Sequence, residues 1–266
     1  MKRIVLFGLF LMGFLVACQP AIPVDPIFTG CEGPINVPDE HLKVEIRNQV
    51  NATGEELTCI DMQRLIEIDF SNREITDLTG LRYATNLKQI RLFYNKIKSL
   101  EELKGLTKLE SIDVSSNQIS DISPLSGLFS LKQLQLAENE IKDLKPLESL
   151  PQLTGLYISQ NQVSDISSLA GLTQLSRLYL AYNQIRDISS LSGLTKLAEL
   201  NLFFNRLTDI KPLINNQGIG EGDFVDINFN CFPTWDNTNA VLKADIQKLL
   251  DRGVLLNYDQ QEATCD

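Results

Sequence analysis

Hydrophobic positions in the middle of the chain recur every 22 residues. Five apolar columns begin at Leu65, Ile68, Phe70, Ile75 and Leu81, and they keep this spacing through seven periods. Two of the apolar positions in each period are only two residues apart, which predicts one short strand per period. A fixed period of about 20 to 50 residues is typical of a solenoid, in which each repeat buries its apolar face against its neighbours. The middle of the chain is therefore predicted to be a stack of short repeats.

Two polar columns accompany the apolar ones. The first consists of Asn95, Asn117, Asn139, Asn161, Asn183 and Asn205, with Arg73 at the matching position of the first repeat. The second consists of Asp77, Asp121, Asp143, Asp165, Asp187 and Asp209, interrupted by Ser99. An Asn after each strand can satisfy backbone groups of the turn that would otherwise be buried without partners. An Asp before a short helical turn can cap it, and we prefer this interpretation to a calcium ladder because the Gly-rich nonapeptide of calcium-binding β-rolls is absent.

The pattern Leu-x-x-Leu-x-Leu-x-x-Asn-x-Ile resembles the leucine-rich repeat, in the 22-residue form of bacterial internalin-like proteins. This resemblance implies an α/β fold, namely a right-handed leucine-rich repeat solenoid with a parallel concave sheet, short helical turns on the convex side and helical N- and C-terminal caps. Seven regular repeats and one divergent repeat, with a strand near Val225, occupy residues 65–230. Residues 31–64 and 231–266 are the two caps.

Each cap is predicted to contain a helix, because a solenoid exposes apolar surface at both ends. In the N-terminal cap, Asp39 is expected to begin a helix whose buried face is formed by Leu42, Ile46 and Val50. In the C-terminal cap, the segment from Asn239 to Asp251 has an apolar face formed by Leu242, Ile246, Leu249 and Leu250. Gly253 follows at a position that ends a helix, and Val254 to Leu256 are expected to form a last strand.

The N-terminus has the features of an export signal. Lys2 and Arg3 precede an apolar run of 13 residues, which is too short to cross a hydrocarbon core of about 30 Å comfortably. Residues 15–18 resemble the bacterial lipobox, which implies removal of a lipoprotein signal peptide, residues 1–17, and lipidation of Cys18. The alternative is an ordinary signal peptide with an incidental Cys. By the same resemblance, Gln19 favours the outer membrane, so we expect a lipid-anchored protein of the bacterial cell envelope with a Pro-rich tether over residues 18–30.

Four further cysteines remain in this exported chain, and three pairings of them are possible. Strands stack at about 4.8 Å, so the two ends of eight turns lie roughly 34 Å apart. A disulfide needs Cα atoms within about 7 Å. Only the pairs Cys31–Cys59 and Cys231–Cys265 meet this requirement, and a zinc site built from all four cysteines fails it.

The composition excludes several classes of function. The chain has 24 Lys and Arg against 34 Asp and Glu, a formal net charge of −10, so it lacks the clustered cations that nucleic-acid binding needs. His41 is the only His, and the motifs of serine hydrolases, zinc proteases and phosphate-binding loops are missing. We therefore expect no enzymatic activity, no catalytic residue, no metal site and no cofactor.

Protein recognition is the function that this architecture favours. Strand residues that alternate with the core point outward from the concave face, and several of them are aromatic or Arg, which are enriched at protein interfaces. The candidate partner-binding residues are Tyr157, Tyr179, Arg177, Tyr182, Phe203, Phe204, Arg91 and Phe93. We expect a monomer whose concave face binds a protein partner and whose lipid on Cys18 binds the membrane. Two alternatives stay open: the aromatic residues only cover the edge of the sheet, or the protein is an envelope scaffold.

The C-terminal half of the concave face is the preferred site. Tyr157 and Tyr179 occupy the same position in consecutive repeats, so their rings are expected to lie about 4.8 Å apart, which is one strand spacing. The acidic N-terminal half, around Glu67, Asp69 and Asp113, is the next candidate.

Overall fold

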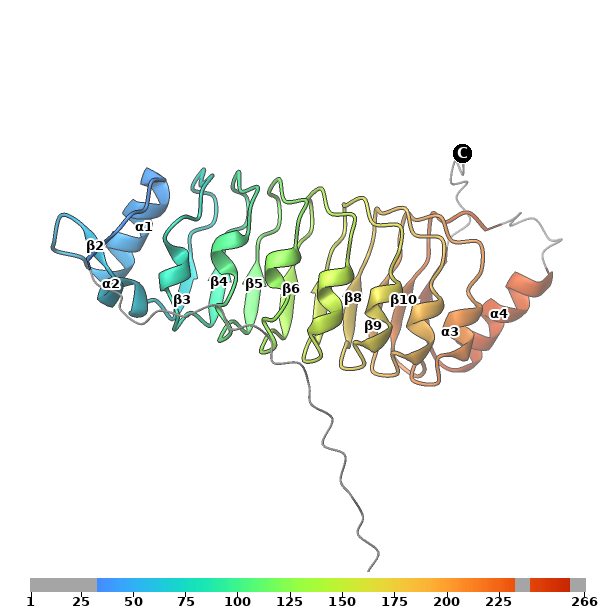
Figure 1. Ribbon diagram of the computed structural model, residues 1–266. Helices are drawn as coiled ribbons and strands as arrows, with labels where there is room; N and C mark the ends of the chain where they lie inside the picture. Colours follow the sequence, from blue (N-terminus) through green and yellow to red (C-terminus); the bar gives the residue numbers. More distant parts are fainter. Residues whose placement is uncertain (1–32, 233–239, 259–266) are drawn as a thin grey trace, which may run out of the picture. The chain divides into compact units, whose positions relative to one another are not determined.

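Nine parallel strands form one sheet in the order of the sequence. The computed structural model describes residues 33–232 and 240–258, which lie in one compact unit (Figure 1). The strands are β3 (Glu67–Asp69), β4 (Gln89–Arg91), β5 (Ser111–Asp113), β6 (Gln133–Gln135), β7 (Gly155–Tyr157), β8 (Arg177–Tyr179), β9 (Glu199–Asn201), β10 (Phe224–Asp226) and β11 (Leu255–Asn257). Each strand pairs only with its neighbours along the chain, and equivalent residues of consecutive repeats lie opposite one another. This arrangement confirms the predicted solenoid.

A short helical turn follows each of the strands β3 to β9, and Figure 1 shows these turns side by side. Most of them are single 3-10 turns. They are η1 (Leu81–Tyr83), η2 (Glu101–Leu103), η3 (Ser123–Leu125), η4 (Lys145–Ser149), η5 (Ser167–Gly171), η6 (Ser189–Gly193) and α3 (Lys211–Asn215). Neighbouring turns pack against one another as the strands do.

The core is built from the five apolar columns. Every residue of these columns is buried, and most are completely inaccessible to solvent. Burying one Leu or Ile side chain contributes about 1.5–3 kcal/mol. A single repeat cannot achieve this burial, because its apolar side chains are covered by those of the repeats before and after it.

The Asn residues connect consecutive repeats through their side-chain amides. Nδ2 of Asn139 donates to the carbonyl oxygens of Leu136 in its own repeat and Val114 in the preceding repeat, at 3.1 Å each. Oδ1 of Asn139 accepts from the N–H of Ile119 at 2.9 Å. The same three bonds recur along the column from Asn95 to Asn230. The predicted structural role of these residues is confirmed by these contacts.

The Asp column also accepts backbone hydrogen bonds, although at a different position from the one expected. Oδ1 of Asp121 accepts from the N–H of Ser123, the first residue of η3, at 2.8 Å. The Asp therefore lies one residue before the N-cap, which is Ile122. The equivalent bond forms at the other Asp residues of the column, and Oγ of Ser99 accepts it where the Asp is missing. Asp and Ser can both occupy this position, because the side-chain oxygen of either residue can accept a hydrogen bond from the backbone N–H two residues ahead.

The N-terminal cap is attached to the first repeat by polar contacts. Asp39 is the N-cap of α1 (Glu40–Val50), as predicted: its Oδ1 accepts from the N–H of Leu42 at 3.0 Å. Its Oδ2 accepts from the N–H groups of Thr76 and Asp77 in the first repeat, so one carboxylate joins two segments. Burial pushes the pKa of Asp39 up, but these N–H donors outweigh burial and hold the pKa below its usual value.

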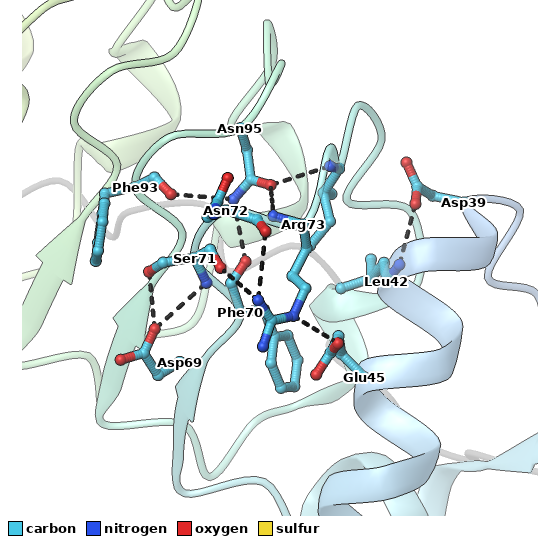
Figure 2. A network of polar contacts seen from close by, with 11 residues as sticks. Asp39, Leu42, Glu45, Asp69, Phe70, Ser71, Asn72, Arg73, Phe93 and Asn95 are labelled. Atoms are coloured by element: carbon cyan, nitrogen blue, oxygen red, sulfur yellow. Dashed lines mark hydrogen bonds and ion pairs between the residues drawn. The ribbon is translucent and has the colours of Figure 1, made fainter.

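Arg73 replaces the missing Asn of the first repeat and links that repeat to the cap. Its Nε donates to Glu45 of α1 at 2.7 Å, and its guanidinium also donates to the carbonyl of Ser71 (Figure 2). Its backbone N–H donates to Oδ1 of Asn95, which begins the Asn column. Arg73 therefore links the cap to the repeats through hydrogen bonds. This contact does not follow from the repeat pattern, which only indicates that an Asn is missing at this position.

The cap contains three further short elements that the sequence pattern did not indicate. They are the antiparallel pair β1 (Pro34–Ile35) and β2 (Leu57–Thr58) and the helix α2 (Cys59–Gln63). Thr58 and Asp61 form a capping box at the start of α2, in which each side chain bonds the backbone N–H of the other.

The C-terminal cap consists of α4 (Ala240–Asp251) and β11. As predicted, Leu242, Ile246 and Leu249 are buried, and Gly253 ends the helix with a φ of 81°. The N–H of Gly253 donates to Leu250 and that of Val254 donates to Leu249, which is the Schellman arrangement. The last strand, β11, begins at Leu255, one residue later than expected. It pairs with β10 and is the ninth strand of the sheet.

Cys59 and Cys231 are both disulfide-bonded. Cys18, Cys31 and Cys265 lie outside the described residues, so the proposed pairing stays a prediction. The predicted signal peptide and the predicted tether, residues 1–30, also lie outside the described residues. None of the helices in the described part of the chain is long and apolar enough to cross a membrane.

Candidate binding surface

Two columns of side chains project from the face of the sheet opposite to the core, here called the outward face. They come from the first and third residues of the strands β3 to β10, because alternate strand residues point to opposite sides. The first-residue column is Glu67, Gln89, Ser111, Gln133, Gly155, Arg177, Glu199 and Phe224. The third-residue column is Asp69, Arg91, Asp113, Gln135, Tyr157, Tyr179, Asn201 and Asp226. Aromatic side chains occur only toward the C-terminal end of both columns.

Tyr157 and Tyr179 stack on the outward face. They lie opposite one another in the pairing of β7 with β8, and their ring centroids are 4.9 Å apart with an interplanar angle of 20°. The expected ring separation is confirmed. Such a stack is a flat, rigid apolar surface, because each ring restricts the rotation of the other.

A carboxylate holds Tyr179 in place. The hydroxyl of Tyr179 donates a hydrogen bond to Oε2 of Glu199 on β9. This hydrogen bond, together with partial burial and the negative charge of Glu199, raises the pKa of Tyr179 to about 12, while nearby Arg177 opposes the shift. Tyr179 therefore stays protonated and acts as a donor at any physiological pH.

A second group of rings follows the ends of the last strands. Its members are Tyr182, Phe203, Phe204 and Phe229, here called the aromatic row. Tyr182 stacks on Phe204 at 5.1 Å and meets Phe203 edge-on at 5.2 Å, and Phe203 meets Phe229 at 4.9 Å. Tyr182 and Phe204 are 47% and 48% exposed, so the row forms an apolar patch that water reaches.

Three members of the aromatic row have an unusual backbone conformation. Tyr182, Phe204 and Phe229 each precede the Asn of their repeat, and their φ angles are 54°, 52° and 54°. The equivalent residues of the other repeats, Asn72 among them, also have positive φ. The turn therefore requires the left-handed region, which bulky side chains rarely adopt.

Phe229 is a member of the row that sequence reasoning missed. It belongs to the divergent repeat, in which the spacing from Phe204 is 25 residues instead of 22. Its position directly before Asn230 is the signal that could have identified it, because the residue before each Asn of the column is equivalent to Phe204.

Two predicted site residues lie elsewhere. Arg91 and Phe93 belong to the second repeat, at the acidic end of the outward face, and Arg91 forms an ion pair with Asp69 at 3.8 Å. Four strand positions separate β4 from β8, so these residues do not join the Tyr157–Tyr179 stack or the aromatic row. The predicted set thus divides into three groups along the sheet.

Two open hollows lie on the surface of the described part of the chain. An open hollow of about 290 Å³ adjoins the aromatic row and includes Gln184 and Arg206 in its lining. A second one of about 580 Å³ lies around η5 and η6, among Asp165, Arg186 and Asp187. Within residues 33–232 and 240–258, no group of His, Cys, Asp and Glu is arranged to hold a metal ion.

Comparison with known proteins agrees with this architecture. A family model described as leucine-rich repeats in two copies matches residues 85–127, 130–171 and 173–215. Internalin C2 of Listeria monocytogenes is 28% identical, with a TM-score of 0.71, and the match covers 84% of this chain and 94% of that chain. The chain has a leucine-rich repeat fold and is similar to an internalin.

Two other solved structures share this fold. The internalin InlF of Listeria monocytogenes is 24% identical, with a TM-score of 0.73, over 83% of this chain and 68% of that chain. A leucine-rich repeat protein of Leptospira interrogans is 24% identical, with a TM-score of 0.66, over 75% of this chain and 50% of that chain. No curated protein sequence matches the chain significantly. The matches support a role in protein–protein interaction and indicate no catalytic family.

Proposed function

We propose that this internalin-like protein is a non-enzymatic envelope protein that recognises a protein partner through the C-terminal half of its outward face. The observation that carries the proposal is the concentration of rings there, in the Tyr157–Tyr179 stack and the aromatic row. Core packing of the repeat does not require these rings, since most of the equivalent positions in other repeats hold polar residues such as Asp, Gln or Ser. Rigid, amphipathic rings bury a large area on binding at a small cost in side-chain entropy.

The proposal is tested by the double substitution Tyr157→Ala with Tyr179→Ala. A partner is first captured with the protein as bait, and its affinity for the native and variant proteins is then measured. We expect binding to weaken by more than about 2 kcal/mol, which is the usual threshold for an interface hot spot. The melting temperature should change by only a few degrees, because both rings lie outside the core.

The matched control is Arg91→Ala with Phe93→Ala at the other end of the sheet. This pair removes one aromatic ring and one large polar side chain from the acidic end of the sheet, and we expect it to leave the affinity unchanged. Normal binding by the tyrosine variant and loss of binding by the control would move the site to the acidic half around Glu67, Asp69 and Asp113.

We also propose that the protein is anchored in the bacterial outer membrane through a lipid on Cys18. The support comes from residues 15–18, which resemble a lipobox, and from Gln19 after the Cys. Cys18→Ser should abolish palmitate labelling and release the protein from membranes; a labelled, membrane-bound variant would contradict the proposal. Protease treatment of intact cells then shows which side of the membrane the domain faces. Cleavage means that the domain faces the exterior, where an external partner could bind it. Protection favours the alternative of a scaffold that binds other envelope components.

A further inference from the structure

The polar groups around the Tyr157–Tyr179 stack are unevenly satisfied. Glu199, the nearby acceptor, is engaged by the hydroxyl of Tyr179. The guanidinium of Arg177 donates no hydrogen bond and forms no ion pair within the described residues, and it is exposed. The hydroxyl of Tyr157 likewise donates to no group in that part of the chain. The guanidinium of Arg177 and the hydroxyl of Tyr157 are therefore two available hydrogen-bond donors beside the apolar surface of the stacked rings.

Arg177 does not form the ion pair that its position in the repeat allows. Opposite charges at equivalent positions of consecutive repeats pair elsewhere, as in Asp69–Arg91, Glu74–Lys96 and Glu110–Lys132. Arg177 and Glu199 are also 22 residues apart and lie directly opposite one another in the pairing of β8 with β9. No ion pair forms between them, because the carboxylate of Glu199 turns toward the hydroxyl of Tyr179.

The Tyr179–Glu199 hydrogen bond thus has two effects on the same site. It orients the ring that Tyr157 stacks on, and it withdraws the acceptor that Arg177 would otherwise use. Arg presents five N–H donors in a planar fork that matches a carboxylate. A side chain of this kind, next to an apolar surface and without a partner of its own, is complementary to an acidic residue that has an apolar neighbour.

We propose that this site binds an acidic segment of the partner protein, with a carboxylate on Arg177 and an adjacent apolar side chain on the Tyr157–Tyr179 rings. The inference rests on the proposed function, because it names the chemistry of the partner at the same surface. A partner that instead placed a cationic side chain on Glu199 and the tyrosine rings would contradict this proposal.

Three short peptides test the proposal directly on the purified full-length protein. They are N-acetyl-Trp-Glu-amide, N-acetyl-Trp-Gln-amide and N-acetyl-Trp-Lys-amide, and their Kd values are measured by ligand-observed NMR. We expect the Glu peptide to bind about three- to tenfold more tightly than the Gln peptide, which is the effect of a charge-assisted pair at a partly exposed site. The Lys peptide should bind most weakly.

Two variants assign the effect to Arg177. Arg177→Gln should bring the Glu and Gln peptides to equal affinity. Arg186→Gln removes an Arg that also lacks an ion pair within the described residues but lies by η6, and it should leave the preference for Glu intact. Both side chains lie outside the core, so both variants should fold normally, which melting curves verify.

The outcomes separate this inference from the proposed function. Equal binding of the Glu and Gln peptides by the native protein, a preference for Lys, or no binding of any peptide would overturn the carboxylate assignment. The aromatic site would still stand if Tyr157→Ala with Tyr179→Ala weakened binding of the captured partner. If that double variant bound the partner normally, the proposed function itself would fail.

Discussion

Within the Asn column, a backbone carbonyl group accepts hydrogen bonds from the Asn side chains of two consecutive repeats, and this predicts a specific energetic coupling between them. The carbonyl oxygen of Leu136 accepts from Nδ2 of Asn139 in its own repeat and from Nδ2 of Asn161 in the next, at 3.1 and 3.0 Å. In the described part of the chain it has no other hydrogen-bond donor. The N–H of Ile119, by contrast, depends on Asn139 alone. Single and double substitutions therefore leave different numbers of buried groups without partners.

The expected magnitudes follow from counting these groups. Asn139→Ala leaves one buried N–H without a partner, while the carbonyl of Leu136 keeps its bond from Asn161. A buried group left unsatisfied costs about 1–3 kcal/mol, so we expect this loss in the free energy of unfolding. Asn161→Ala similarly leaves the N–H of Ile141 unpaired. The double substitution additionally strips the carbonyl of Leu136, so its cost should exceed the sum of the two single costs by about 1–3 kcal/mol.

A double-mutant cycle measured by urea denaturation provides the assay. The control cycle combines Asn117→Ala with Asn183→Ala, which are the same substitutions at positions that share no carbonyl. The control should be additive within about 0.5 kcal/mol, as is usual for distant sites. Additivity in the adjacent pair as well would refute the reasoning, because it would mean that the shared carbonyl finds another donor. An unchanged m-value is required in every variant, so that the stack unfolds as one unit.

Three further predictions concern single positions. Tyr94→Asn should raise the free energy of unfolding by about 1 kcal/mol, because Tyr94 is 65% exposed with a φ of 57°, and Asn tolerates the left-handed region as Asn72 does in the first repeat; a lower urea midpoint would contradict this. Asp39→Asn should be less stable than the native protein at pH 7, and the difference should shrink as the pH falls below about 4. The sign follows from the lowered pKa of Asp39, since protonation removes stability that is present only above that pKa; a constant difference between pH 7 and 3 would contradict it. Gly218→Ala should lower the free energy of unfolding by more than about 2 kcal/mol, because the new Cβ would lie 1.9 Å from the backbone oxygen of Thr195. An unchanged melting temperature would contradict this and show that the backbone around Gly218 can move away.

Much of the fold could be predicted because its stability depends on a repeated local rule. Each apolar column has one position per repeat, so the period alone identifies the core residues, the strands and the connecting Asn. The contacts of the caps could not be predicted in this way. Arg73 bonds Glu45 of α1, and Asp39 bonds the backbone of Thr76, in pairs that occur once and far apart in the sequence. No periodic signal records such a contact.

The candidate site likewise has one feature that follows from the repeat and one that does not. The stacking of Tyr157 on Tyr179 was predictable, because equal positions in consecutive repeats must lie one strand spacing apart. The unpaired Arg177 was not, because the same register argument predicts an ion pair with Glu199. Only the side-chain geometry shows that Tyr179 takes that carboxylate. Competition between two neighbours for one acceptor is a property of the folded surface and leaves no pattern in the sequence.

The backbone conformation of the aromatic row supports a role beyond stability. Holding an L-residue in the left-handed region costs roughly 1–2 kcal/mol, and the row places a large ring there at Tyr182, Phe204 and Phe229 in three consecutive repeats. The turn itself accepts smaller or more tolerant residues, since Asn72 and Ser116 occupy the same position. Contacts between the rings offset part of the strain, yet about half of the surface of Tyr182 and Phe204 stays exposed to water. A partner that covers these rings would use apolar surface that the isolated fold leaves unburied, and this is why we assign the strained row to the proposed binding surface and not to the core.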